Sequence, residues 1–180
     1  MNNSFNTSLY QSEMLTLVNM AVKKLKSEYP NYEVYTMSLT KDFSSGISAI
    51  HFDSRSYSQR YLQKEAEQYQ KYLQAGNQSM AELYAPTGEI RITNPADFEL
   101  PFYVEIQNKC FHFSFENEQA NEDSDTEDDI LSIYWNEALP ILKQVATVAY
   151  QTAKSELKID IEAFEVSYNG PEDWYYPLEQ

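Results

Sequence analysis

The sequence predicts a single α+β domain, in which an antiparallel sheet of about five to six strands packs against three helices. Apolar residues recur at helical spacing in some segments and alternate at strand spacing in others, in the order helix, hairpin, helix, hairpin, helix, strand. Strands that follow one another directly favour antiparallel pairs with helices on one face of the sheet. The 180 residues suit one compact domain, and no repeat or linker divides residues 1–180.

The first third of the chain is predicted to form a helix followed by a β-hairpin. The helix should run from Ser8 to Tyr29, and Pro30 helps to end it. Its inward face is predicted to hold Met14, Val18, Ala21 and Leu25. Two β-rich runs follow, Tyr32–Thr40 and Ile47–Asp53, and the short polar loop between them is typical of a hairpin.

A second helix is predicted over Tyr57–Ala75, because Leu62, Ala66, Tyr69 and Leu73 share one helical face. Gly76 is a natural stop signal for it. Residues 77–100 contain two prolines and a glycine, so we expect at most a short strand there, at Glu89–Thr93.

A second hairpin is predicted around the turn Asn108-Lys109, with Phe102–Gln107 and Cys110–Phe115 as its strands. This register places six apolar side chains on one face and fixes the pairing, since a slip of one residue would mix the two faces. On the other face, Glu105 should lie directly across from His112.

The last third is predicted to contain a long apolar helix, Ile130–Leu157, and a strand. Its inward residues are predicted to be Leu131, Ala138, Leu142, Val145 and Ala149. Pro140 should kink this helix or mark a restart after an Asn136 cap. Ile159 and Ile161 alternate with polar residues as in a strand, and a bulge near Ala163 would carry the strand on to Tyr168.

Acidic residues are concentrated late in the chain. The net charge is −15; residues 101–180 hold 17 acidic and four basic residues, whereas residues 1–100 hold 11 and nine. Residues 116–129 contain eight acids and no base, which predicts a mobile loop because so little apolar area offsets the entropy of ordering. A negative electrostatic potential concentrated in one region of the protein would speed its association with a basic protein. It argues against binding nucleic acid or an anionic membrane.

Several kinds of chemistry are disfavoured by the residues present. The single Cys allows no internal disulfide and no four-cysteine zinc site. The four glycines are far apart in sequence, whereas a phosphate-binding loop needs several within a few residues. Asn121, Asp123 and Asp125 imitate the start of an EF-hand, but Thr126 and Ser132 stand where glycine and glutamate are required. We therefore expect no cofactor, no metal and no enzymatic activity.

One constellation resembles a catalytic site. Glu105 and His112 face each other in the predicted hairpin, and Cys110 lies on the same face two residues away. The simplest interpretation is an exposed polar pair on a sheet. The alternatives are a nucleophile activated by a base, and a metal site that His51 would complete from another strand.

Aromatic residues add a second sign of a binding protein. Tyrosine, with 15 residues, offers a large rigid contact surface with a polar tip. The acidic and aromatic tail, residues 169–180, contains Trp174-Tyr175-Tyr176, which is expected either to pack on the core or to contact a partner. The candidate partner-binding residues are Glu122, Asp123, Asp125, Glu127, Asp128, Asp129, Glu172, Asp173, Trp174, Tyr175 and Tyr176.

The chain opens with a predicted helix followed by two β-rich runs, YEVYTMSLTKD at Tyr32–Asp42 and ISAIHFD at Ile47–Asp53. In this pattern, and in its size and acidity, it resembles immunity proteins of bacterial polymorphic-toxin and contact-dependent growth inhibition systems. The resemblance covers about the first third of the chain and carries no signature motif, so no binding residue follows from it. It implies a cytoplasmic, non-enzymatic protein that binds one cognate toxin, often a basic nuclease, and blocks its active site. The amino terminus, which lacks the features of a signal peptide, agrees with that expectation.

Two other functions fit the composition. An acidic chaperone for a secreted effector would have a similar size and charge, and it should form a stable homodimer. A nucleic-acid mimic that sequesters a DNA-binding protein is a variant of the toxin-binding hypothesis, and the identity of the captured partner would separate the two.

Overall fold

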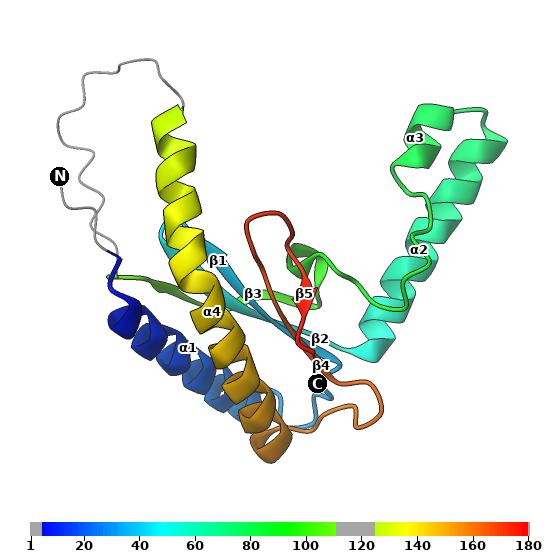
Figure 1. Cartoon of the computed structure of the whole chain (residues 1–180). Coiled ribbons are helices and arrows are strands. Elements are labelled where there is room, and N and C mark those ends of the chain that lie inside the picture. Colours follow the sequence, from blue (N-terminus) through cyan, green and yellow to red (C-terminus); the bar gives the residue numbers. More distant parts are fainter. Residues whose placement is uncertain (1–4, 111–124, 180) are drawn as a thin grey trace.

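A computed structural model of the chain shows the predicted α+β architecture as one sheet with helices on one of its faces (Figure 1). The structure describes residues 5–110 and 125–179. The helices are α1 (Thr7–Glu28), α2 (Arg55–Gln74), α3 (Gln78–Glu82) and α4 (Asp125–Glu156), with a 3-10 turn, η1 (Pro95–Asp97). The strands are β1 (Thr36–Asp42), β2 (Ile47–Asp53), β3 (Leu100–Gln107), β4 (Glu165–Tyr168) and β5 (Tyr176–Pro177).

The sheet has the strand order β3-β2-β1-β4-β5. The predicted first hairpin is confirmed, because β1 and β2 pair antiparallel with Leu39 opposite Ile50. β3 lies antiparallel to β2, and β5 lies antiparallel to β4. The β1–β4 pair is parallel, with Leu39 opposite Tyr168, so the sheet is mostly rather than wholly antiparallel. A parallel pair requires a long crossover between its strands, and the chain from β2 to α4 supplies it.

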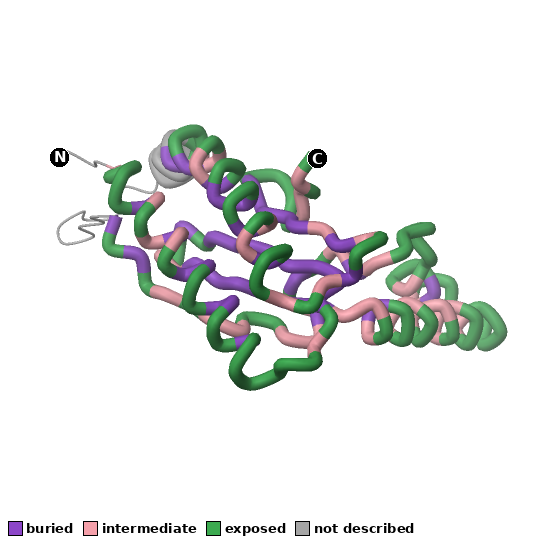
Figure 2. The backbone as a smooth tube through the Cα atoms, turned by 90° about the horizontal axis from the view of Figure 1, so that it is seen from below, coloured by how far each residue is buried: buried purple, intermediate pink, exposed green. Residues whose placement is uncertain are grey.

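The main core lies between the sheet and the helices α1 and α4, where the innermost parts of the backbone are buried (Figure 2). All four residues predicted to face inward on the first helix are buried. On α4, alanines at 138, 146, 149 and 153 are fully buried, and their small side chains allow α1 to approach closely. Pro140 lies inside α4, which continues past it without the restart considered at Asn136.

The other face of the sheet is also buried, although its side chains are small or polar. Ser38 on β1 is opposite both His51 on β2 and Ser167 on β4, and all three are almost fully buried. The His51 ring contacts Thr40 Oγ1 at 2.7 Å and accepts a 3.0 Å hydrogen bond from the Phe102 amide. Phe102 has a positive φ of 47°, at an irregularity that turns its side chain towards solvent.

The second predicted helix exists, as α2, but it does not cover the sheet. With α3 it forms an arm that projects away from the other layers (Figure 1). Ser58 is the one buried residue of α2. The last turns of α2 meet α3 and the segment beyond it: Tyr72 of α2 stacks on Tyr84 with ring centroids 5.7 Å apart, and Ala81 of α3 is fully buried. We call α2 and α3 together the arm.

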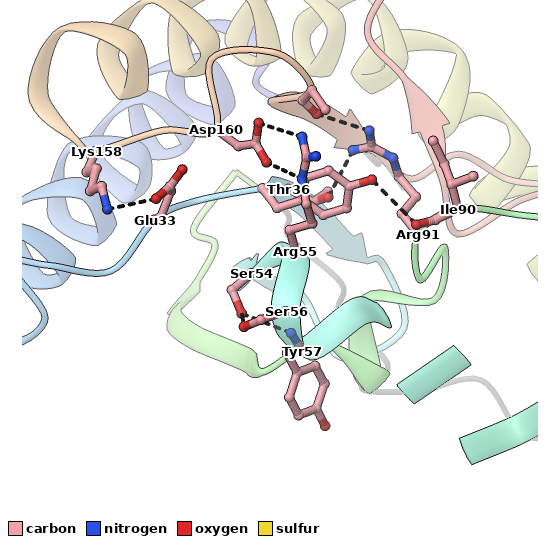
Figure 3. A network of polar contacts seen from close by, with 12 residues as sticks. Glu33, Thr36, Ser54, Arg55, Ser56, Tyr57, Ile90, Arg91, Lys158 and Asp160 are labelled. Carbon is pink, nitrogen blue, oxygen red and sulfur yellow. Dashed lines mark hydrogen bonds and ion pairs between the residues drawn. The ribbon is translucent and has the colours of Figure 1, made fainter. Parts of the chain in front are cut away.

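The base of the arm is fixed to the carboxyl-terminal part of the chain by an ion pair, and hydrogen bonds from Arg91 lie nearby (Figure 3). Arg55, at the start of α2, donates two hydrogen bonds to the carboxylate of Asp160. Arg91 donates to Thr36 Oγ1 and to the Ala163 carbonyl, at 3.1 and 3.0 Å. These bonds hold together segments that are more than 50 residues apart in sequence.

Several predicted strand positions are wrong. Residues 89–93 form no strand, and the strand predicted around Ile159 and Ile161 is reduced to one bridge between Val34 and Ile159. Ile161 is 90% exposed because residues 161–163 form a turn, which replaces the predicted bulge. The short strand β5 in the tail was not predicted, because apolar and polar residues do not alternate there as in a strand. The return strand predicted at Cys110–Phe115 lies outside the described residues from position 111 onwards.

Asp53, directly before the arm, is a buried carboxylate with an incomplete set of hydrogen bonds. Its Oδ1 accepts a 3.2 Å bond from the Glu99 amide, whereas its Oδ2 accepts none from the residues described. Burial raises the pKa of Asp53 to about 6, against an ordinary value of 3.8. The folded state therefore favours the protonated carboxyl group.

We expect Asp53→Asn to stabilise the fold at neutral pH by about 1–2 kcal/mol. With a raised folded-state pKa, the stability that Asp53 contributes is complete below its unfolded value and is lost as the pH rises through about 6. Urea denaturation of both proteins at about pH 4 and about pH 7 should show a difference that grows with pH. The exposed Asp173→Asn serves as the control, and a difference for Asp53→Asn that is the same at both pH values would refute the assignment.

Candidate protein-binding site

A pocket of about 310 Å³ lies where the turn after β1, the helix α4 and the loop between β4 and β5 meet. We call it the tryptophan pocket; it is lined by Lys41–Ser44, Trp135 and Asn169–Trp174. Both tryptophans of the chain line it, although they are far apart in sequence. The pocket is small but falls at the lower end of the size range of ligand pockets.

The side chain of one asparagine, Asn169, forms hydrogen bonds to the backbone of β1 and fixes the tail loop against that strand. Asn169 is 2% exposed; its side chain accepts from the Lys41 amide at 2.8 Å and donates to the Lys41 carbonyl at 2.9 Å. Gly170 follows, and its amide donates to the Asp173 carbonyl at 2.9 Å. A Cβ at Gly170 would lie 2.6 Å from the Tyr176 ring, so a larger residue there would force the loop to shift. The wall of the pocket is therefore rigidly placed.

The aromatic residues of the pocket differ in exposure. Phe43 is buried and meets Trp135 edge to face, with ring centroids 4.7 Å apart. Trp135 is half-buried, whereas Trp174 is 61% exposed. An exposed tryptophan beside a packed one leaves an indole surface that a partner can cover.

The pocket is also anionic. Asp42, Glu172 and Asp173 line it, all three are exposed, and none forms an ion pair within the described part of the chain. Partial burial raises the pKa of Asp42, but hydrogen bonds from Ser44 outweigh that effect, so its pKa lies below the usual value. The Asp42 carboxylate is therefore ionised at neutral pH.

Lys41 is the one basic residue that lines the pocket, and its ammonium group points into the protein. The side chain is 1% exposed, and Nζ donates to Asn108 Oδ1 at 3.0 Å. Burial lowers the pKa of Lys41 to about 8, so the ammonium group is still mostly charged at neutral pH and loses its charge as the pH rises through about 8. The pocket is lined by three exposed carboxylates, Asp42, Glu172 and Asp173, and by one buried ammonium group, so its net charge is negative.

The two tail tyrosines are half-buried, and each contacts a residue of β4. Tyr175 donates a hydrogen bond to Glu165, and burial raises its pKa. Tyr176 stacks on Tyr168, with ring centroids 6.1 Å apart. Of the triplet considered in the sequence, Trp174 alone remains mostly uncovered.

The acidic segment before α4 is only partly described. Glu122 and Asp123 lie outside the described residues, as do most positions of the EF-hand imitation. Asp125, Glu127, Asp128 and Asp129 belong to the first turns of α4, so this part of the predicted loop is helical. Acidic residues suit a helix start because they oppose the positive end of its dipole. A helix rises about 1.5 Å per residue, so the backbone of these four residues lies roughly 9 to 15 Å from that of Trp135 along the helix axis.

Charge in the sequence does not map simply onto faces of the molecule. The acids Glu156, Asp160 and Glu165 from the later part of the chain are paired with bases from the earlier part. A larger pocket, of about 870 Å³, lies beside the base of the arm, but its charged residues are largely paired with each other, as in Lys158 with Glu33 at 2.7 Å. A basic protein can use carboxylates that form no ion pair, and Asp42, Glu172 and Asp173 form none within the described part of the chain.

The predicted catalytic constellation is not assembled within the described residues. Glu105 is exposed on β3, Cys110 is buried, and His112 lies outside the described residues. His51 lies on the second face of the sheet, and burial lowers its pKa to about 4. No group of three His, Cys, Asp or Glu residues in the described ranges is arranged to hold a metal ion.

Comparisons with known proteins gave no match: no protein-family model, no curated protein and no solved structure is similar to this chain. Among the described residues, none of the helices combines the length and the apolar character that a membrane crossing requires.

We expect the Cys110 thiol to be inert in the folded protein. Burial raises its pKa to about 12, and the thiolate is the reactive form. A thiol reagent at about pH 8 should modify native protein at least about 100-fold more slowly than unfolded protein. Rapid modification of the native chain would show instead that Cys110 is an activated nucleophile.

Proposed function

We propose that this chain is a toxin-neutralising immunity protein that binds a basic toxin domain, such as a nuclease, and blocks it. The observation that carries the proposal is the tryptophan pocket, where unpaired carboxylates surround an exposed indole. Protein interfaces are typically centred on aromatic anchors, with charges that guide the encounter. The protein would act by binding alone, in the bacterial cytoplasm.

The acidic start of α4 lies on the same helix as Trp135. Its acidic residues precede Trp135 on the same helix, so a partner seated over the pocket would lie within reach of them. In a nuclease, carboxylates of this kind would replace substrate phosphates in the basic cleft. A net charge of −15 gives such an encounter a strong long-range attraction.

The arm favours a second candidate, the acidic chaperone. Leu83 and Ile90, on or next to the arm, are 72% and 73% exposed, and a homodimer could cover them. Light scattering of the purified protein separates the candidates, because the chaperone should be a stable dimer and the immunity protein need not be.

The proposal is tested by co-expression with the product of the neighbouring gene, followed by affinity measurement of the purified pair. We expect a tight complex of defined stoichiometry, and we expect the affinity to fall at least about tenfold between low and high salt. Glu172→Gln/Asp173→Asn should weaken binding by at least about tenfold, mainly by slowing association.

A matched control is Glu67→Gln/Glu82→Gln, which removes the same charge from exposed positions on the arm. It should leave the affinity within about twofold. If both double variants weakened the complex equally, net charge alone would explain binding and the pocket would have no special role. Absence of any salt-sensitive complex would contradict the proposed function.

A further inference from the structure

We propose that the tryptophan pocket receives one arginine side chain of the partner protein, stacked on Trp174 and held by Glu172 and Asp173. This inference rests on the proposed function, because it names the chemical group that the binding surface recognises. It goes further by assigning the centre of the interface to a single pocket rather than to acidic residues in general.

The residues that line the pocket favour a flat cation. Tryptophan is the best aromatic partner for a cation above its ring, and Trp174 is exposed along one wall. Glu172 and Asp173 follow the turn at Gly170 and line the same pocket as Trp174, and Asp173 Oδ1 accepts a 3.2 Å hydrogen bond from the Tyr175 amide. A guanidinium group can stack on the ring and donate two parallel hydrogen bonds to a carboxylate at once.

Lysine and apolar side chains fit these features less well. An ammonium group is a compact, strongly hydrated charge, so it gains less from stacking and cannot donate in a planar fork. An apolar side chain would leave three carboxylate side chains to be desolvated without compensation. Arginine is also among the residues most often found at interface hot spots.

The floor of the pocket is compatible with a bound cation. The ammonium group of Lys41 is directed at Asn108 Oδ1 and the Ile47 carbonyl, on the side away from the tail loop, and it lies 5.2 Å from the centre of the Phe43 ring. Its charge opposes a second cation, but Asp42, Glu172 and Asp173 outnumber it. By contrast, the cations that line the larger pocket beside the arm, Arg55 and Lys158, are paired with the acids there.

The chain itself supplies the probe, because its two tryptophans both line this pocket. Titration with N-acetyl-arginine-amide should change the tryptophan emission in a saturable way. N-acetyl-citrulline-amide has nearly the same shape without the charge, and it should give no saturable change. N-acetyl-lysine-amide should bind at least about fivefold more weakly than the arginine derivative.

Variants test whether the arginine derivative binds at this pocket. Glu172→Gln/Asp173→Asn should weaken binding of the arginine derivative at least about fivefold, whereas Glu67→Gln/Glu82→Gln should not. Trp174 is mostly exposed, so Trp174→Ala leaves the fold intact and should abolish most of the binding, which calorimetry measures without the lost fluorophore. The arginine derivative should also compete with the partner protein in the complex.

The outcomes separate this inference from the proposed function. If the partner protein binds but the arginine derivative neither binds nor competes, the arginine pocket is refuted and the proposed function stands. If the derivative binds at the pocket but no basic partner is captured, the pocket stands and the proposed function fails. Equal affinity for the lysine and arginine derivatives would overturn the choice of arginine.

Discussion

The structure depends on β1, the central strand of the sheet. Six of its seven residues are buried, and its pairing with β2 on one side and β4 on the other joins the two ends of the chain. The parallel pairing with β4 is the demanding one, because a crossover must return the chain to the centre of the sheet. α4 accomplishes this by packing its alanine-lined side against α1 and delivering β4 beside β1.

The same pairing creates the candidate binding surface. The register that sets Leu39 opposite Tyr168 brings Asn169 to Lys41, and the bonds between those two residues hold the tail loop over the turn after β1. Trp174 and Trp135 meet at one pocket for this reason. The acidity of the pocket mouth likewise follows from the fold, because other acids of the same region are paired with bases elsewhere.

Local patterns predicted the local elements well. The spacing of Met14, Val18, Ala21 and Leu25 identified α1 and its inward face, and the first hairpin has its predicted partners. The predicted face of α2 is correct only in part, since Leu62, Ala66 and Tyr69 are half-buried but Leu73 is exposed. Periodicity indicates which side of a helix is apolar and not what covers it. The covering element is α3, so the helix projects as an arm instead of closing over the sheet.

Long-range pairings were beyond the sequence. Nothing in a run such as Glu165–Tyr168 indicates that its neighbour is a strand more than 120 residues earlier, and the placement of Trp135 beside the tail follows from that pairing. The run of acids indicated a basic partner, but not which carboxylates were already paired. The helical start at Asp125 had a signal, the acids that suit a helix dipole, which the count of charges obscured.

The most direct measurement of the central claim is hydrogen exchange of the chain alone and in complex with its partner. Bound partner should slow exchange at amides 169–176, in the turn after β1 and in the first half of α4, while the arm exchanges as before. Protection confined to the arm or to the larger pocket at its base would contradict the account, since the acidic end that carries both tryptophans would then not be the surface that captures a basic protein.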